Sequence, residues 1–249
     1  MCIIATKPKG VFISKETAKN CFENNPDGAG FMFASKGSLT IRKGFFDFDK
    51  FWGSYCQAMV KNDNPTAILH FRITTHGLTD KSNCHPFQVN QNLGFAHNGV
   101  IHFVDNDKTR SDTSMFNDTV LKLLPKDFLN NQGVIALIEE AISSNSKLAF
   151  LDNDGNYTMC NEHKGLWDNG IWYSNETFEA CTVHYNYGSY YWGGHGLHSP
   201  TKPKKKKKKK KYLGGVIRYS CKQCKANLST LYEQNTGMCS TCDKEHYII

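Results

Sequence analysis

The chain has 249 residues, of which 39% are hydrophobic and 12% aromatic, a composition that suits a globular core. No run of 18 or more residues is apolar and no signal-peptide core opens the chain, so we expect a cytoplasmic protein without a membrane partner. The net charge of +7 is unevenly distributed along the chain. Residues 201–249 carry 13 Lys/Arg and 3 Asp/Glu, whereas residues 1–200 carry 17 Lys/Arg and 20 Asp/Glu. A mildly acidic domain with a basic tail is therefore indicated, and the two parts are expected to meet different partners.

The first quarter of the chain predicts a strand, a helix, a hairpin and a second helix. Residues 2–6 are β-branched and apolar, which favours a strand. Ser14 is placed to N-cap a helix that runs to about residue 24. Residues 29–34 and 38–43 predict a hairpin. The aromatic stripe of a helix over residues 47–61 is more typical of a core than of a cofactor site.

The remaining elements fall into segregated groups of strands and helices. Further strands are predicted over 66–71, 93–96 with a continuation over 100–104, and then 147–151, 157–160 and 171–174, the last three forming a second sheet. Helices are predicted from Ser111 to residue 124 and over 133–144. This order predicts an α+β layered domain rather than a regular βαβ repeat.

Cys2 directly follows the initiator methionine. Its side chain is small, so we expect Met1 to be removed, which leaves a thiol and a free α-amine on one carbon. Such an amine has an ordinary pKa of about 7.7–8.0, and it can activate the nucleophile of its own residue. Taken alone, Met-Cys is equally compatible with a small buried residue at the start of a strand.

Three polar sets at strand or helix ends could complete a site around Cys2. Arg72 offers a rigid fork of donors that suits a carboxylate, although a surface arginine is the simpler interpretation. Asn98 and Gly99 could form an oxyanion hole or a plain hairpin turn. Asp112 could bind a substrate ammonium or simply complement a helix dipole. Together, the four features fit glutamine.

These motifs resemble a class II glutamine amidotransferase domain, which is an N-terminal-nucleophile (Ntn) hydrolase. The resemblance covers about residues 2–185. The matching pieces, in chain order, are Cys2, Asp27-Gly28-Ala29-Gly30, His70-x-Arg72-x-x-Thr75-His76-Gly77, Asn83-Cys84-His85-Pro86, His97-Asn98-Gly99-Val100-Ile101 and Ser111-Asp112-Thr113.

The resemblance implies a four-layer α/β/β/α sandwich and assigns roles to single residues. It makes Cys2 the nucleophile, and it makes Asn98 and Gly99 the oxyanion hole. The glutamine carboxylate would bind Arg72 and the α-amine would bind Asp112. The remaining assignments are pocket-lining roles for Thr75 and His76 and a structural role for His85.

A linker and a cysteine module are predicted after the domain. We place the amidotransferase domain at residues 2–187, a glycine- and aromatic-rich, then lysine-rich linker at 188–211, and the module at 212–249. The eight consecutive lysines Lys204–Lys211 repel one another and cannot form a core. They could bind nucleic acid through counterion release or serve as a solvated tether.

The module contains two Cys-x-x-Cys pairs separated by 14 residues, and it resembles a zinc ribbon. Four thiolates at this spacing fit tetrahedral Zn²⁺, which would supply the stability of so small a segment. The expected ligands are Cys221, Cys224, Cys239 and Cys242. The other six cysteines are scattered without a disulfide framework.

The sequence favours an enzyme that hydrolyses the glutamine amide through a Cys2 thioester, with no cofactor for that step. Residues 188–249 are too few for a synthase domain, so the ammonia acceptor would be a partner protein in trans. One alternative is a stand-alone hydrolase of γ-glutamyl amides. Another is an inactive protein that binds nucleic acid or protein through its tail, although the intact set of site residues argues against it.

Overall fold

The computed structural model describes residues 2–104 and 108–180. The chain divides into a unit of residues 1–181 and a unit of residues 182–249. The predicted linker and zinc module, with Lys204–Lys211, Cys221, Cys224, Cys239 and Cys242, lie outside the described residues and stay predictions.

A six-stranded antiparallel sheet forms one half of the described unit, in the order β3-β2-β4-β1-β10-β9. Its strands are β1 (Ile3–Lys7), β2 (Ala29–Ser35), β3 (Ser38–Phe45), β4 (Ala67–Phe71), β9 (Leu166–Asp168) and β10 (Ile171–Tyr173). The first strand is therefore central, because it pairs with β4 on one side and with β10 on the other.

A four-stranded antiparallel sheet forms the other half, in the order β5-β6-β7-β8. Its strands are β5 (Phe87–Asn90), β6 (Leu93–Asn98), β7 (Lys147–Asp152) and β8 (Tyr157–Cys160). All six residues of β6 are buried, as expected for a strand covered on both faces.

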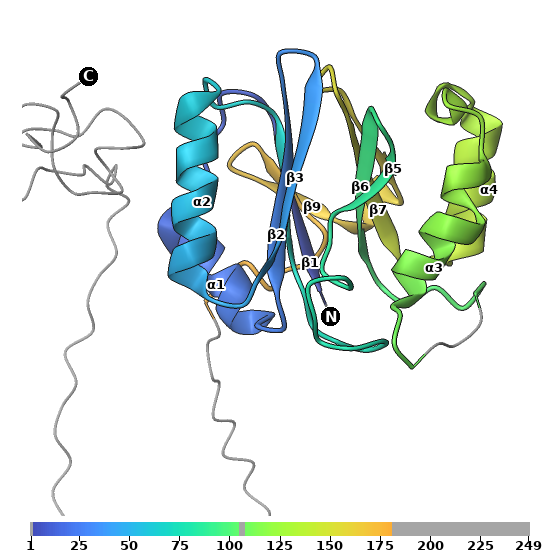
Figure 1. Ribbon diagram of the computed structural model, residues 1–249, viewed down its shortest axis with the longest axis horizontal. Coiled ribbons are helices and arrows are strands. Elements are labelled where there is room, and N and C mark those ends of the chain that lie inside the picture. Colours follow the sequence, from blue (N-terminus) through green and yellow to red (C-terminus); the bar gives the residue numbers. More distant parts are fainter. Residues whose placement is uncertain (1, 105–107, 181–249) are drawn as a thin grey trace, which may run out of the picture. The chain divides into compact units, whose positions relative to one another are not determined.

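Helices cover the outer face of each sheet (Figure 1). The six-stranded sheet carries α1 (Lys15–Asn24) and α2 (Phe48–Lys61), and the four-stranded sheet carries α3 (Asp112–Thr119) and α4 (Gln132–Ile142). Short 3₁₀ turns occupy Leu121–Leu123, Phe128–Asn130 and Glu162–Lys164. The described residues thus have the layer order α/β/β/α. Of the helices in this part of the chain, none is long and apolar enough to cross a bilayer.

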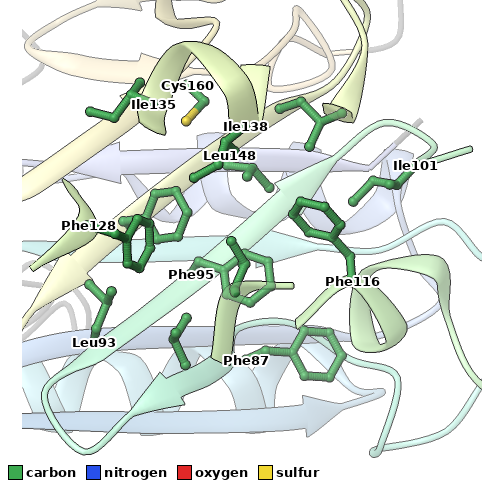
Figure 2. Packing of buried hydrophobic residues seen from close by; sticks show 14 residues of the cluster. Phe87, Leu93, Phe95, Ile101, Phe116, Phe128, Ile135, Ile138, Leu148 and Cys160 are labelled. Carbon is green, nitrogen blue, oxygen red and sulfur yellow. The ribbon is translucent and has the colours of Figure 1, made fainter. Parts of the chain in front are cut away.

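Apolar cores between neighbouring layers hold the sandwich together. The core between the sheets includes Ile4, Met32, Ile68, Ala96 and Trp172. The core between the four-stranded sheet and its helices is rich in phenylalanine, and Figure 2 shows Phe95, Phe116 and Phe128 gathered there with aliphatic side chains of α4. Because both faces of β6 are packed, the end of this strand is fixed in two directions.

The sequence correctly predicted most of the helices and strands in the first half of the described unit. The Ser14 hydroxyl accepts the backbone N–H of Thr17 at 2.9 Å and caps α1 as predicted. The hairpin of β2 and β3 turns through Lys36 and Gly37, which both have positive φ. The aromatic residues of α2, such as Phe51 and Tyr55, are buried in the core.

Two sequence-based expectations are wrong. Residues 100–104 do not form a strand, because the backbone N–H of Ile101 bonds to the Asp112 carboxylate at 2.6 Å instead of to a neighbouring strand. Residues Ile171–Tyr173 belong to the six-stranded sheet, not to the second sheet, since Tyr173 pairs with Ala5 of β1. In that position Trp172 fills the space between the sheets.

Candidate active site

A narrow pocket lies at the end of the sandwich where β1 begins and β4 ends. Six of the seven residues predicted for the glutaminase site line it, and these are Cys2, Arg72, Thr75, His76, Gly99 and Asp112. The seventh, Asn98, is the last residue of β6 and directly precedes Gly99. Residues more than 100 positions apart in the sequence thus meet at one point.

Cys2 is held from both sides at the start of β1. Its Sγ lies 3.4 Å from both the backbone nitrogen and the carbonyl oxygen of Ile73. Its own carbonyl accepts the side-chain N–H of Asn175 at 2.7 Å. Burial raises the pKa of the Cys2 thiol, against the opposing effects of the Ile73 backbone and the Arg72 charge. The thiol is therefore protonated at neutral pH and needs a base before it can attack.

The imidazoles near Cys2 are poor candidates for that base. His85 and His97 line the pocket, but burial lowers the pKa of His97 to about 4 and that of His85 well below its ordinary value. A base with so low a pKa takes up a proton only weakly at neutral pH. In the part of the chain that the structure describes, the hydrogen-bond partner of the Cys2 sulfur is the Ile73 backbone rather than an imidazole.

Asn98 is oriented by Ser174, which directly follows β10 of the other sheet. Its Nδ2 donates to the Ser174 hydroxyl at 2.9 Å, and the same hydroxyl accepts the backbone N–H of Ile4 at 2.9 Å. One amide N–H of Asn98 is used in this way, so the second can serve a ligand. Gly99 has φ +140°, and a side chain there would collide with Ser146. Gly99 is thus required by both conformation and space.

Arg72 follows β4 and is buried, with 3% of its surface exposed. Its Nη1 donates to the carbonyl of Leu78 at 2.9 Å and its Nη2 to the carbonyl of His76 at 2.9 Å. The guanidinium is therefore held by the segment that directly follows it. A guanidinium has five N–H donors, which leaves capacity for a substrate carboxylate.

Asp112 opens α3, with Ser111 as the N-cap. Its Oδ1 accepts both the backbone N–H of Thr113 at 2.8 Å and the Thr113 hydroxyl at 3.3 Å. Its Oδ2 accepts the backbone N–H of Ile101 at 2.6 Å. A carboxylate oxygen has two lone pairs, so Oδ2 keeps one lone pair for a cationic ligand.

The Asp112 carboxylate is connected to β6 through a threonine. The Nδ1 of His97 lies 2.7 Å from the Thr113 hydroxyl. Because that hydroxyl donates its proton to Asp112, it must accept the N–H of the imidazole, which assigns the proton of neutral His97 to Nδ1. The His97 Nε2 is buried, and it has no hydrogen-bond partner among the residues that the structure describes.

Three buried histidines, His70, His85 and His97, lie close together, and two of them, His85 and His97, line the pocket. The His70 Nε2 lies 3.0 Å from the carbonyl oxygen of His97. The ring centroids of His70 and His85 are 4.1 Å apart. Burial lowers the pKa of His70 to about 3, so it is neutral at pH 7. His85 is buried as well, and its structural role stays a prediction. Among the described residues, no group of three or more His, Cys, Asp or Glu could hold a metal ion.

Four residues that matter for this geometry were not assigned a role from the sequence. Asp27 accepts the backbone N–H of Thr74 at 2.7 Å and so fixes the segment after Arg72. Asn83 and Asp27 belong to motifs that the sequence did single out. Ser174 and Asn175 reach the site from beyond β10, and no local pattern marks them.

The pocket is almost closed. The room left between its lining side chains is about 10 Å³, enough for about one water molecule. The segment that carries His76 and Leu78 borders this space through the His76 side of its chain. The loop end of this segment is partly exposed, with 52% of the Leu78 surface accessible.

Comparison with known proteins yields little beyond a weak structural likeness. No protein-family model and no curated protein matches the chain. One similar solved structure is glutamine phosphoribosylpyrophosphate (PRPP) amidotransferase from B. subtilis complexed with ADP and GMP, with 15% identity and a TM-score of 0.43. The match covers 70% of this chain and 41% of that protein. A likeness at this level carries no argument about function.

Proposed function

We propose that the chain hydrolyses the side-chain amide of glutamine to glutamate and ammonia, as a class II amidotransferase of the Ntn type. The observation that carries this proposal is that a nucleophile, Cys2, a cation, Arg72, and a carboxylate, Asp112, line one pocket. The α-carboxylate and α-ammonium groups of an amino acid complement the two charges. A thiol suits attack on the carbonyl of its side-chain amide.

Removal of Met1 makes the nitrogen of Cys2 a free α-amine that can act as the base. The amine takes the thiol proton while Sγ forms a bond to the amide carbon. This assistance is needed because burial keeps the thiol protonated at neutral pH. A chain that retains Met1 has an amide nitrogen at Cys2, which is not basic, and it should be inactive.

The negative charge that develops on the amide oxygen would be stabilised by the Gly99 N–H and the second N–H of Asn98. Collapse of the tetrahedral intermediate breaks the C–N bond and releases ammonia, which takes the proton held by the amine. The γ-glutamyl group is then a thioester on Cys2. Water adds to this thioester, the C–S bond breaks, and glutamate leaves as the sulfur regains a proton.

A glutaminase assay on the full chain tests this proposal. Glutamate and ammonia should form from glutamine in equal amounts, and Cys2→Ala should abolish both. Cys56→Ala, which removes a thiol from α2 on the far side of the six-stranded sheet, is the matched control and should keep the activity. A wild-type chain shown by mass spectrometry to lack Met1, yet unable to form glutamate, would contradict the proposal.

Transfer of the ammonia to a partner synthase is the fuller form of this proposal. A partner that consumes ammonia should co-purify with the chain in a pull-down and should raise its glutamine turnover. A chain that hydrolyses glutamine at full rate alone, and captures no such partner, would instead be a stand-alone amide hydrolase.

A further inference from the structure

Asn83 does not line the pocket, yet its side chain is buried, with 1% exposed, and is bonded at both ends of its amide. Its Oδ1 accepts the backbone N–H of Ser111 at 2.7 Å. Its Nδ2 lies 2.8 Å from the carbonyl of Thr109 and 3.2 Å from the carbonyl of Leu78. It also lies 3.2 Å from the carboxylate of Asp80, which accepts the backbone N–H of Asn83 as well.

Two of the groups that Asn83 contacts, the Leu78 carbonyl and the Ser111 N–H, lie next to the two charged residues of the pocket. The Leu78 carbonyl is also the acceptor of Arg72 Nη1, so it holds the cation in place. Ser111 is the N-cap of α3 and directly precedes Asp112, so its position sets that of the carboxylate. One amide group therefore bonds the backbone that positions Arg72 and the backbone that positions Asp112.

The same two backbone segments also touch each other directly. Leu78 N–H donates to the Thr109 carbonyl at 3.3 Å. Gly77 has φ +72°, and a Cβ there would lie 2.7 Å from the backbone of Arg110 and of Ser111. Asn83 adds a side-chain hydrogen bond to this contact, since its Nδ2 also donates to the Thr109 carbonyl.

We infer that Asn83 is a positioning residue that fixes the separation of Arg72 and Asp112, and thereby the fit of an α-amino acid to both. This inference rests on the proposed function. The carboxylate and ammonium of an amino acid are attached to one carbon, so their binding groups must be held at a matching separation. Losing that separation weakens binding of substrate and transition state alike, which raises KM and leaves kcat nearly unchanged.

Asn83→Leu removes both hydrogen-bonding ends of the amide at similar size. We expect it to raise the KM for glutamine about tenfold, the equivalent of about 1.4 kcal/mol, and to change kcat less than about threefold. Asn83→Asp keeps an acceptor for Ser111 but removes the donors to Leu78 and Thr109, and its KM should also rise. The matched control is Asn117→Leu, which removes another buried asparagine of α3, bonded to the Gln88 carbonyl at 3.0 Å.

Hydrogen exchange of the backbone amides supplies a measurement that is independent of activity. The amides of Leu78 and Ser111 should exchange faster in Asn83→Leu than in wild type or Asn117→Leu, because their positions are no longer fixed. Unchanged exchange at both amides would overturn the inference, and so would a loss of kcat at constant KM. If wild-type protein forms no glutamate, the proposed function fails, and the exchange measurement still decides the positioning role.

Discussion

The side-chain amide of Asn98 donates a 2.9 Å hydrogen bond to the hydroxyl of Ser174, which lies 76 residues further along the chain. The same hydroxyl accepts the backbone N–H of Ile4, two residues after Cys2. One serine thus ties the proposed oxyanion donor to the strand that carries the proposed nucleophile. The two sheets are joined at the point where the chemistry would occur.

This relationship predicts graded losses of catalysis. Asn98→Ala removes an oxyanion donor and should lower kcat by about 10²–10³-fold. Ser174→Ala leaves the donor in place but no longer orients it, so we expect a loss of about tenfold in kcat. Steady-state glutamate formation measures both. Ser54→Ala, which removes a hydroxyl bonded to Arg42 outside the site, should have wild-type kcat, and an unaffected Ser174→Ala would refute the orienting role.

The sequence predicted the parts of this site that depend on local order. Arg72, Asn98 and Asp112 each stand at the end of a strand or the start of a helix, where neighbouring residues already mark the boundary. Ser174 and Asn175 could not be predicted in this way, because their roles arise only when β10 pairs with β1, about 170 residues away in the sequence. A contact between residues so far apart produces no periodicity or spacing in the local sequence from which it could be predicted.

The limits of local sequence patterns also explain the errors in the predicted fold. The strand β5 begins at Phe87, immediately after Pro86, and the sequence predicted no strand there. The expected strand over 100–104 is apolar enough in sequence, but the Asp112 carboxylate captures the backbone N–H of Ile101. For residues 100–104 a tertiary contact therefore outweighs the local preference, whereas β5 is a four-residue strand too short to leave a clear alternation.

The proposed amine base predicts the pH dependence of catalysis. Because burial raises the pKa of the Cys2 thiol, the thiolate does not accumulate at neutral pH, and the rate should follow the amine instead. The kcat/KM should therefore rise with pH through about 7.7–8.0, where an ordinary α-amine loses its proton. A profile measured from pH 5.5 to 9.5 checks this. A pH-independent rate below pH 7 would contradict an amine base.

The buried histidines predict a loss of stability on acidification. The folded pKa is lowered to about 3 for His70 and about 4 for His97, from 6.5 in the unfolded chain. Between these values the unfolded state binds more protons, so the free energy of unfolding falls as the pH falls from about 6.5 toward about 4. Each such histidine contributes at most about 1.4 kcal/mol per pH unit.

Urea unfolding at pH 7.5, 6.0 and 5.0 measures this effect. His70→Gln should reduce the slope of stability against pH, because it removes one of the groups that must stay neutral on folding. His163→Gln, which replaces an exposed histidine, is the control and should leave the slope unchanged. Equal slopes for wild type and His70→Gln would show that His70 does not cause the loss of stability at low pH.

The cysteine module predicts one zinc ion in each chain. Thiolate ligands are lost in the double variant Cys221→Ser/Cys224→Ser, so its zinc content should fall to background. Elemental analysis of the purified full chain, together with the Cys56→Ser variant as a thiol control, measures this. Glutamine hydrolysis should survive the double substitution, because the proposed glutaminase step uses no metal. A wild-type chain that binds no zinc at neutral pH would contradict the prediction.

The hydrogen bonds from His97 to Thr113 and from Thr113 to Asp112 predict a binding defect at position 113. Thr113→Val keeps the shape of the side chain but removes the hydroxyl that donates to Oδ1 of Asp112, so the carboxylate is less firmly oriented toward an ammonium. We expect KM for glutamine to rise about fivefold with little change in kcat, in keeping with the loss of one hydrogen bond of about 1 kcal/mol. Thr113→Ser retains the hydroxyl and should restore KM to near the wild-type value. Equal KM values for the valine and serine variants would show that the hydroxyl does not act on Asp112.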